Sequence, residues 1–307
     1  MRLAGGQITA ARMQWPGELI AGQVEDAVLV SRTAGSSRGT ARFTSGEEAL
    51  VDRLTRDASE GAPLRLKVMR AAIGERGRLK RAQARPTEEP SHIPTLADSL
   101  AAEGHEVRIV RRFGGGDWDE LVAEASAREV SFAGGSLLFA PTPAMLMIDI
   151  DGALPPRELA LAAIPALASA IQRFDVGGAI GIDFPTLDQK DGRRAVDEAL
   201  GQALADWPHE RTAMNGFGFV QLVARLERPS LLHRAANASA AFAARLLLRR
   251  AEALEGAGAI LLQGHPALEA PLEPWLAELA RRTGREVRWE ARPTLAIAAP
   301  QAQLVPR

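Results

Sequence analysis

The chain has 307 residues, of which 46% are hydrophobic and 24% are charged, as in a globular protein of about one to three domains. Its formal net charge of −1 excludes binding of nucleic acid through overall positive charge, and the absence of cysteine excludes disulfides and cysteine zinc sites. The first residues lack the apolar core of a signal peptide and no run is long enough to span a membrane, so we expect a cytoplasmic protein without a membrane partner.

Residues 14–85 consist of short apolar segments separated by glycine and serine, which predicts short strands and a small β-barrel. The end of this region is basic. Its charged residues from position 70 on are Arg70, Arg76, Arg78, Lys80, Arg81 and Arg85, with Glu75 as the one acid. Such a cluster is typical of a phosphate-binding surface and equally of a solvated charged edge, so the sequence leaves both interpretations open.

Residues 86–94 are rich in proline, glutamate and serine and are typical of a linker. Residues 95–129 then predict a helix, a strand, a glycine-rich turn at Phe113–Asp119 and a second helix. The turn lacks the Lys-Ser/Thr pair of a Walker phosphate loop and the glycine spacing of a dinucleotide site, so we interpret it as a plain turn.

Residues 130–230 have the most regular pattern in the chain and indicate an α/β core, because predicted strands alternate with helices. The predicted elements are a hairpin of two strands, a helix over about 157–173, a strand over 177–184, a helix over about 193–206 and a strand over 213–226. Beyond residue 229 the pattern predicts a long helix to about residue 255, a strand over 259–264, a helix over 270–284 and a final strand over 285–292.

Three aspartates stand at the ends of two predicted strands. Asp149 and Asp151 follow an apolar run, and residues two apart on a strand point to the same face. Asp183 ends the next strand after a helical crossover, which places the carboxyl ends of neighbouring strands side by side. Three carboxylates at one point repel one another unless a cation is present, and oxygen ligands suit Mg²⁺. We therefore expect a metal site that activates water for attack on a phosphodiester.

A structural role for each aspartate stays open at this point, because an aspartate at a strand end often caps the next helix or forms an Asx turn. The five histidines are scattered without the spacing of metal ligands. No serine nucleophile motif stands out, and a cysteine nucleophile is excluded.

Three stretches that surround these aspartates occur in a fixed order. They are REVSFAGGSLLFAPTPAMLMIDIDGA (Arg128–Ala153), RFDVGGAIGIDF (Arg173–Phe184) and NGFGFVQLVARLERPSL (Asn215–Leu231). They resemble the catalytic core of the bacterial ribonuclease E/G family, which has REV, a GGS hairpin and a strand ending in IDxN, then RDLGGxIxIDF, and then RFGLxEMxRxRxxPSL. The order and the similar spacing make the resemblance more specific than the aspartates alone.

The resemblance implies an endoribonuclease that uses Mg²⁺, with Mn²⁺ as an alternative metal, to cleave single-stranded RNA. The family's two metal-binding aspartates fall on Asp149 and Asp183, and its catalytic asparagine falls on Asp151. We expect all three to be catalytic. The implied fold is multidomain α/β: an OB-fold RNA-binding barrel at 1–85, a linker with a ribonuclease-H-like remnant at 86–127, a catalytic α/β core of deoxyribonuclease I type at 128–231, and a small C-terminal α/β domain at 232–307.

Departures from the family pattern limit these expectations. Without cysteine the family's zinc link between subunits cannot form, so a zinc-bridged tetramer is excluded and a homodimer is compatible with the sequence. The family inserts a sensor for the 5′-monophosphate of RNA between barrel and hairpin, whereas only about forty residues separate Arg85 from Arg128 here, so we expect this regulation to be absent or much altered. Gly216 and Gln221 replace a family arginine and glutamate. With no tyrosine in the chain and Phe43 as the only phenylalanine in the predicted barrel, base stacking by the barrel is weakened.

The leading hypothesis is a compact Mg²⁺-dependent endoribonuclease acting on single-stranded RNA. The candidate RNA-binding residues are Arg76, Arg78, Lys80 and Arg81 near the barrel, and Arg225 and Arg228 after the third motif. For the last two, plain surface charge is an equal alternative. One rival is an RNA-binding protein derived from such an enzyme that no longer cleaves. Another is a phosphodiesterase that acts on a small nucleotide or on DNA, which the same metal chemistry allows.

Overall fold

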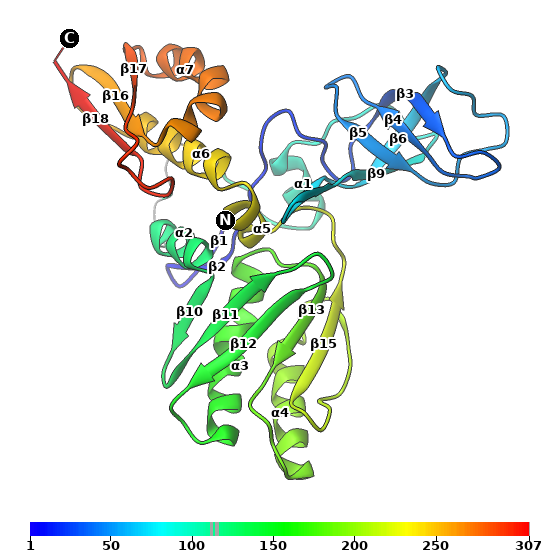
Figure 1. Cartoon of the computed structure of the whole chain (residues 1–307), viewed down its shortest axis with the longest axis vertical. Helices are drawn as coiled ribbons and strands as arrows, with labels where there is room; N and C mark the ends of the chain where they lie inside the picture. The colour runs from blue at the N-terminus through cyan, green and yellow to red at the C-terminus, as the bar shows by residue number, and fades with distance from the viewer. Residues whose placement is uncertain (111–112, 114–116, 307) are drawn as a thin grey trace. The chain divides into compact units, whose positions relative to one another are not determined.

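The structure is a computed structural model that describes residues 1–110, 113 and 117–306 (Figure 1). It divides into two compact units, residues 1–233 and residues 234–307. The mixed α/β architecture predicted from the sequence is confirmed and includes a closed five-stranded barrel. The finer four-part division of the chain stays a prediction. No helix in the described ranges is both long and apolar enough to cross a bilayer.

The barrel occupies the N-terminal part of the first unit, after a short hairpin of β1 (Arg2–Ala4) and β2 (Gln7–Ala10). Its strands are β3 (Val24–Arg32), β4 (Gly39–Arg42), β5 (Glu48–Val51), β6 (Pro63–Arg70) and β9 (Ala82–Pro86), in the closed order β3-β4-β5-β9-β6. A separate hairpin, β7 (Ile73–Glu75) and β8 (Arg78–Lys80), lies between β6 and β9 in the chain. Strand alternation explains the fold, because Leu66 and Val68 are fully buried whereas Arg65 before them is exposed and Lys67 between them is partly exposed.

Two helices follow the barrel. In α1 (Leu96–Ala102), Thr95 and Asp98 form a reciprocal capping box, and α2 (Trp118–Ala127) begins after Asp117, whose side chain accepts a hydrogen bond from Glu120 N at 2.9 Å. The strand predicted between the helices is wrong for residues 105–110, which are irregular and exposed because no other strand pairs with them. The predicted glycine-rich turn lies partly outside the described residues.

A six-stranded sheet with the order β10-β11-β12-β13-β15-β14 forms the rest of the first unit. Its elements in chain order are β10 (Glu129–Phe132), β11 (Gly135–Pro141), β12 (Leu146–Gly152), α3 (Pro156–Arg173), β13 (Gly178–Asp183), α4 (Lys190–Ala203), β14 (Glu210–Arg211) and β15 (Phe219–Ala224). The sequence predicts a two-stranded hairpin here, but the structure has three antiparallel strands, because residues 133–134 turn the chain between β10 and β11. Only β12 and β13 are parallel neighbours, with α3 as their crossover.

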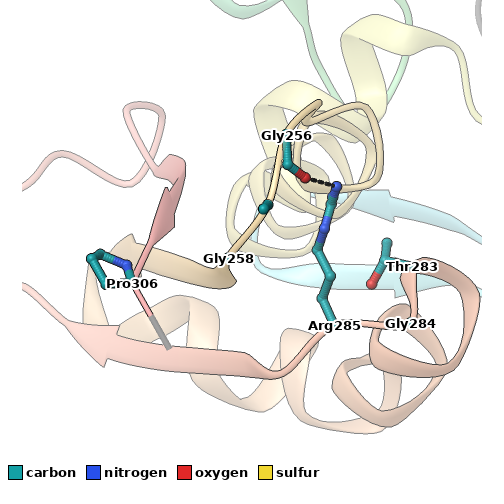
Figure 2. Close-up of a pocket in the computed structure, with 7 residues that line it drawn as sticks. Gly256, Gly258, Thr283, Gly284, Arg285 and Pro306 are labelled. Carbon is teal, nitrogen blue, oxygen red and sulfur yellow. Dashed lines mark hydrogen bonds between the residues drawn. The ribbon is translucent and has the colours of Figure 1, made fainter.

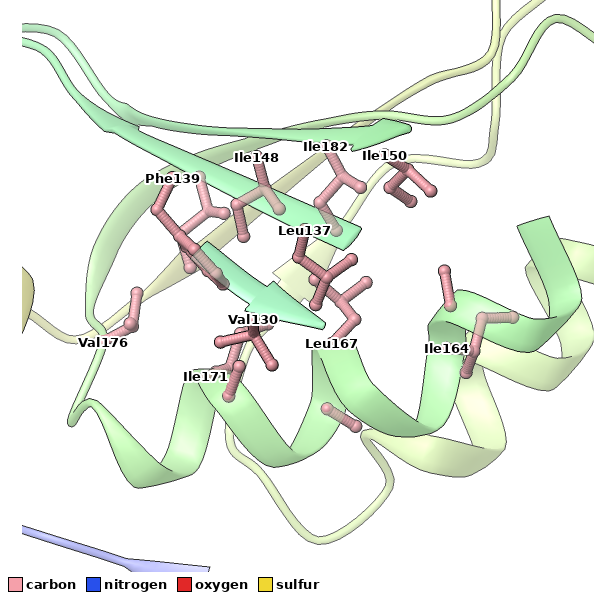
Figure 3. Packing of buried hydrophobic residues seen from close by; sticks show 14 of the residues in the cluster. Val130, Leu137, Phe139, Ile148, Ile150, Ile164, Leu167, Ile171, Val176 and Ile182 are labelled. Atoms are coloured by element: carbon pink, nitrogen blue, oxygen red, sulfur yellow. The ribbon is translucent and has the colours of Figure 1, made fainter. Parts of the chain in front are cut away.

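The core of this sheet lies between its strands and α3 (Figure 3). Residues spaced by four on α3, among them Leu159, Ala163, Leu167 and Ile171, are buried and form one apolar stripe. They pack against alternate residues of the strands, such as Ile148 and Ile182. Burial of each such side chain contributes roughly 1.5–3 kcal/mol, which fixes the face of every strand that points toward the helices.

The second unit packs helices against a three-stranded sheet with the order β17-β16-β18. The helix predicted from residue 230 to about residue 255 is interrupted at Ala238, which leaves the helical region with φ −132° and ψ 39°. A further strand lies at residues 301–305, where the apolar pattern is too weak to predict one. The elements are α5 (Leu231–Asn237), α6 (Ser239–Glu252), β16 (Ala259–Gly264), a 3-10 turn (Pro266–Leu268), α7 (Glu269–Thr283), β17 (Val287–Ala291) and β18 (Gln301–Val305).

Candidate active site

The six-stranded sheet has one covered face and one open face. Helices α3 and α4 lie along the same side of the sheet in Figure 1. On β12, Leu146, Ile148 and Ile150 are buried toward this side, so the alternate residues of the strand point the other way. Asp149 and Asp151 are therefore on the open face, and both are exposed.

Asp149 and Asp183 are neighbours on this open face. They are register partners in the parallel pairing of β12 with β13, and the pair before them, Ile148 and Ile182, is buried on the covered face. Adjacent strands are about 4.8 Å apart, so the two carboxylates are side by side. Like charges on adjacent strands are destabilising. No cationic side chain in the described ranges forms an ion pair with either aspartate, so no described residue offsets their mutual repulsion in this way.

Asp151 lies two residues beyond Asp149 on β12. It is the register partner of Ser136 on β11, and its Oδ1 accepts a hydrogen bond from Gly152 N at 2.8 Å. Within residues 1–110, 113 and 117–306, no group of three or more His, Cys, Asp or Glu side chains is gathered closely enough to hold a metal. The structure thus brings together two of the three aspartates, and the third keeps one carboxylate oxygen bonded to its own backbone.

An apolar floor borders Asp183 on the open face. Phe219 on β15 is the register partner of Asp183. A Cβ on Gly181 would lie 2.6 Å from Phe219 Cζ, 2.9 Å from Met147 Sδ and 3.0 Å from Met145 Sδ. These three side chains therefore converge over Gly181, and only glycine leaves them room.

A tight turn connects this floor to the end of β13. Asn215 Oδ1 accepts hydrogen bonds from Phe217 N at 2.9 Å and from Phe219 N at 3.1 Å. Gly218 has φ +89°, and its carbonyl accepts a hydrogen bond at 3.2 Å from Phe184 N, the residue after Asp183. A Cβ on Gly218 would lie 2.4 Å from the Phe184 carbonyl oxygen, so the turn requires glycine there. Phe217 at its tip is 82% exposed.

Comparison with curated proteins matches the chain to ribonuclease G of several bacteria. Ribonuclease G of Escherichia coli K12 and that of Shigella flexneri are each 30% identical to it over 205 residues, and ribonuclease G of Salmonella typhimurium SL1344 is 28% identical over 211 residues. The chain is related to the ribonuclease E/G family. Each match covers 62% of this chain and 40% of the relative, so the chain spans well under half the length of these ribonucleases. No family model matches it.

The basic residues predicted near the barrel lie on or beside the β7–β8 hairpin. Arg78 and Lys80 both form ion pairs with Glu75, the latter at 3.8 Å, and Arg81 lies 3.5 Å from Glu48. Arg76 at the hairpin tip is exposed and has no ion pair with a described residue. Most of the basic residues predicted to bind RNA near the barrel thus already form ion pairs with acids of the same region.

The two predicted arginines after β15 have different environments. Arg228 has 24% side-chain exposure and donates through Nε to Asp175 at 2.8 Å and through Nη1 to Glu227 at 3.0 Å. Arg225 is 76% exposed and lies 3.0 Å from Glu227. Asp175 also lies 3.8 Å from Arg12, so Arg228 belongs to an ion-pair network inside the first unit. Of the two, Arg225 is the one with a solvent-accessible side chain.

A hollow of about 640 Å³ occurs in the second unit, and none of the predicted site residues lines it. Figure 2 shows it lined by Gly256, Gly258, Thr283, Arg285 and Pro306. Arg285 is its charged side chain, and it donates to the carbonyl oxygens of Leu254 at 2.9 Å and Gly256 at 2.6 Å. These bonds hold the segment after α6, so we interpret the hollow as structural.

Sequence reasoning missed Gly181, Phe219 and the turn at Asn215–Gly218 as parts of the site. Phe219 belongs to the third quoted motif, but its partnership with Asp183 depends on the register of β15, which the sequence does not specify. The spacing Asn-x-Phe-Gly, in which an asparagine side chain caps a turn that needs positive φ, is the signal that was available.

Proposed function

We propose that the chain is a Mg²⁺-dependent endoribonuclease of the ribonuclease E/G type that hydrolyses phosphodiester bonds in single-stranded RNA. The observation that carries the proposal is the register pairing of Asp149 with Asp183 on the open face of the sheet, with no ion pair to offset their charges in the described ranges. The curated relatives named ribonuclease G support the choice of RNA as the substrate.

The donor set fits Mg²⁺, which typically takes one or two carboxylates and completes its shell with waters and phosphate oxygens. Asp149 and Asp183 would hold the ion from adjacent strands, and Mn²⁺ is the natural substitute for the same oxygen ligands. When bound, the ion lowers the pKa of a water and neutralises charge on the phosphoryl oxygens. Helices α3 and α4 lie on the other side of the sheet, so they leave the open face accessible to waters and to an RNA strand.

The chain's own residues have distinct roles in this proposal. Asp149 and Asp183 concentrate negative charge at one point and thereby fix where a cation binds. Asp151 has one carboxylate oxygen engaged by Gly152 N and the other available to accept a proton or a hydrogen bond from the attacking water. Where the family carries asparagine, the extra negative charge of Asp151 strengthens cation binding and opposes the approach of phosphate.

The barrel is proposed to hold the RNA strand as an OB-fold. Counted in chain order, its fifth strand, β9, inserts between the third and fourth, β5 and β6, so the barrel is not a simple meander. A closed five-stranded barrel of Greek-key type is the OB architecture, and such barrels bind oligonucleotides. The β7–β8 hairpin, with exposed Arg76 at its tip, supplies the phosphate contact in this proposal.

Single-turnover cleavage of a short fluorescent A/U-rich RNA tests the proposal. With Mg²⁺ the wild type is expected to cleave the RNA, and EDTA is expected to stop it. Loss of a residue that only supports a metal ligand already lowers activity about 10- to 100-fold. Asp149 and Asp183 are proposed as direct ligands, so Asp149→Asn and Asp183→Asn are each expected to lower the cleavage rate at least about 100-fold. Asp191→Asn, an exposed aspartate at the start of α4, is the matched control and should cleave normally. Full activity of either site variant would remove the mechanism.

The second candidate is an RNA-binding protein that no longer cleaves. It is favoured by the gathering of only two acids instead of a larger ligand group in the described ranges. Gln221, which replaces a family glutamate, belongs to the same site, since it is the register partner of Gly181 on β15. RNA that binds in EDTA and stays intact after Mg²⁺ is added would select this function.

A further inference from the structure

We propose that Phe217 is a nucleobase-stacking residue that holds one base of single-stranded RNA beside the aspartate pair. This inference rests on the proposed function, because it names how the same site recognises its substrate. At 82% exposure Phe217 is the exposed aromatic ring of the described chain, since every other described phenylalanine and tryptophan is buried or partly buried. Recognition of single-stranded RNA depends on stacking of unpaired bases on such rings.

The barrel cannot supply this contact. Its phenylalanine, Phe43, is 3% exposed and belongs to the barrel core, and Trp15 just before the barrel is 7% exposed. Stacking on an aromatic ring must then occur elsewhere in the chain. The turn at Asn215–Gly218 offers the ring, and Phe184 N binds the turn directly after Asp183.

The turn is rigid and does not need an aromatic side chain to form. Asn215 Oδ1 binds two backbone N–H groups, and Gly218 supplies the positive φ. Thr186 Oγ1 also donates to the Phe217 carbonyl at 3.5 Å. A phenylalanine at this position gains almost nothing from burial, so its ring is not needed for the stability of the fold.

The surroundings favour a base over a second protein chain as the occupant. The residues beside Phe217 in the turn are Asn215, Gly216 and Gly218, which are polar or lack a side chain, whereas the core of a protein interface is mostly apolar. The aspartate pair repels a phosphate backbone, whereas stacking of an uncharged base on a ring is insensitive to that charge. A base held on Phe217 therefore anchors RNA where the chain's own charges oppose it.

Binding of a short single-stranded RNA that carries 2-aminopurine, measured in EDTA so that cleavage plays no part, tests this inference. The wild type should quench the fluorescence. Phe217→Ala and Phe217→Leu should bind about tenfold more weakly and lose the quenching, whereas Phe217→Trp should keep both. Ile93→Ala, which trims an apolar side chain that is 61% exposed in the linker, is the matched control and should behave as the wild type.

The outcomes separate this inference from the proposed function. Quenching by the wild type without cleavage in Mg²⁺ would remove the nuclease and leave the stacking site in place. Unchanged affinity and quenching in Phe217→Ala would overturn the stacking site, whether or not the protein cleaves RNA. A wild type that does not quench, an abasic oligonucleotide that binds equally well, or a change of oligomeric state in Phe217→Ala would overturn it too.

Discussion

The barrel and the open face of the sheet treat their charges in opposite ways. In the barrel and its hairpin, Arg42, Arg65, Lys67, Arg78, Lys80, Arg81 and Arg85 form ion pairs with acids of the same region. On the open face, Asp149 and Asp183 are adjacent and unpaired within the described ranges. The basic cluster that stands out in the sequence is thus largely satisfied within the chain, and the smaller acidic one is not.

This difference separates charges that serve the fold from charges left for a ligand. Exposed ion pairs contribute little to stability, and a paired arginine must exchange its partner before it binds phosphate. Adjacent unpaired carboxylates destabilise the apo protein, and a bound cation reverses the sign of their contribution.

The turn beside Asp183 should be the most sensitive position of the open face. Gly218→Ala places a Cβ 2.4 Å from the Phe184 carbonyl at φ +89°, and we expect it to lower the free energy of unfolding by about 3 kcal/mol. Gly216→Ala is the matched control, because nothing lies within 4 Å of its Cβ position, and it should change stability by less than about 1 kcal/mol. Urea unfolding measures both. Equal effects of the two substitutions would contradict the turn geometry.

His233, which lies near charged residues of the β7–β8 hairpin, should make the free energy of unfolding depend on pH. Burial lowers the pKa of His233, which lies near Glu75 and Lys80 and shares a 2.8 Å hydrogen bond with Ser230 Oγ. Because its pKa is lower in the folded than in the unfolded state, the unfolded chain binds more protons as the pH falls below about 6.5. His233 therefore makes its full contribution to the free energy of unfolding above about pH 6.5. This contribution is lost as the pH falls through the pKa that His233 has in the folded state.

His233→Gln should reduce this dependence. We expect the free energy of unfolding to fall less between about pH 7 and pH 5 in the variant than in the wild type. The comparison uses the slope against pH and not the absolute stability, since the substitution also alters the hydrogen bond to Ser230. Identical slopes would show that the buried histidine does not titrate across this range.

Neutralising one charge should have opposite signs in the two regions. In EDTA, Asp183→Asn should raise the free energy of unfolding by about 0.5 kcal/mol, because it removes the repulsion from Asp149. Asp52→Asn in the barrel should lower it by at most about 1 kcal/mol, because it breaks the bidentate pair with Arg85 at 2.8 and 3.1 Å. Added Mg²⁺ should then stabilise the wild type and Asp52→Asn but not Asp183→Asn. Stabilisation of all three by Mg²⁺ would place the ion elsewhere.

The elements with strong local signals were predictable from the sequence. The strand over 259–264 matches β16, and the predicted helix over 157–173 matches α3 to within one residue, because apolar periodicity and a proline at the first helical position mark it. The strand expected near residues 105–110 has a strand-like pattern too, yet it needs a neighbour, and pattern alone does not supply one. The same limit hid β18, whose partner β16 lies about forty residues earlier in the chain.

The aspartates of the candidate site could be placed on neighbouring strands from the sequence, but their arrangement could not. Alternation along β12 gave the shared face of Asp149 and Asp151, and the crossover gave Asp183 as a neighbour. Register decided the rest: Asp149 is paired with Asp183, whereas Asp151 is paired with Ser136 on the other side. A shift of one residue between β12 and β13 would have placed Asp149 opposite Ile182 or Phe184 instead of Asp183, and the hydrophobic pattern that prevents it involves strands far apart in sequence.

The hairpin arginines provide the smallest and most local test of the contrast. Arg76→Gln should weaken binding of single-stranded RNA a few-fold and lower the salt slope by about 1, because Arg76 has no ion pair within the described ranges to exchange. Arg78→Gln should have a smaller effect, since its guanidinium already binds Glu75. Both residues are exposed on the same hairpin, so each is the other's control for position. Equal losses of RNA affinity in the two variants would mean that the ion pair with Glu75 does not prevent Arg78 from binding phosphate. The distinction between paired and available charges would then not apply to the barrel and its hairpin.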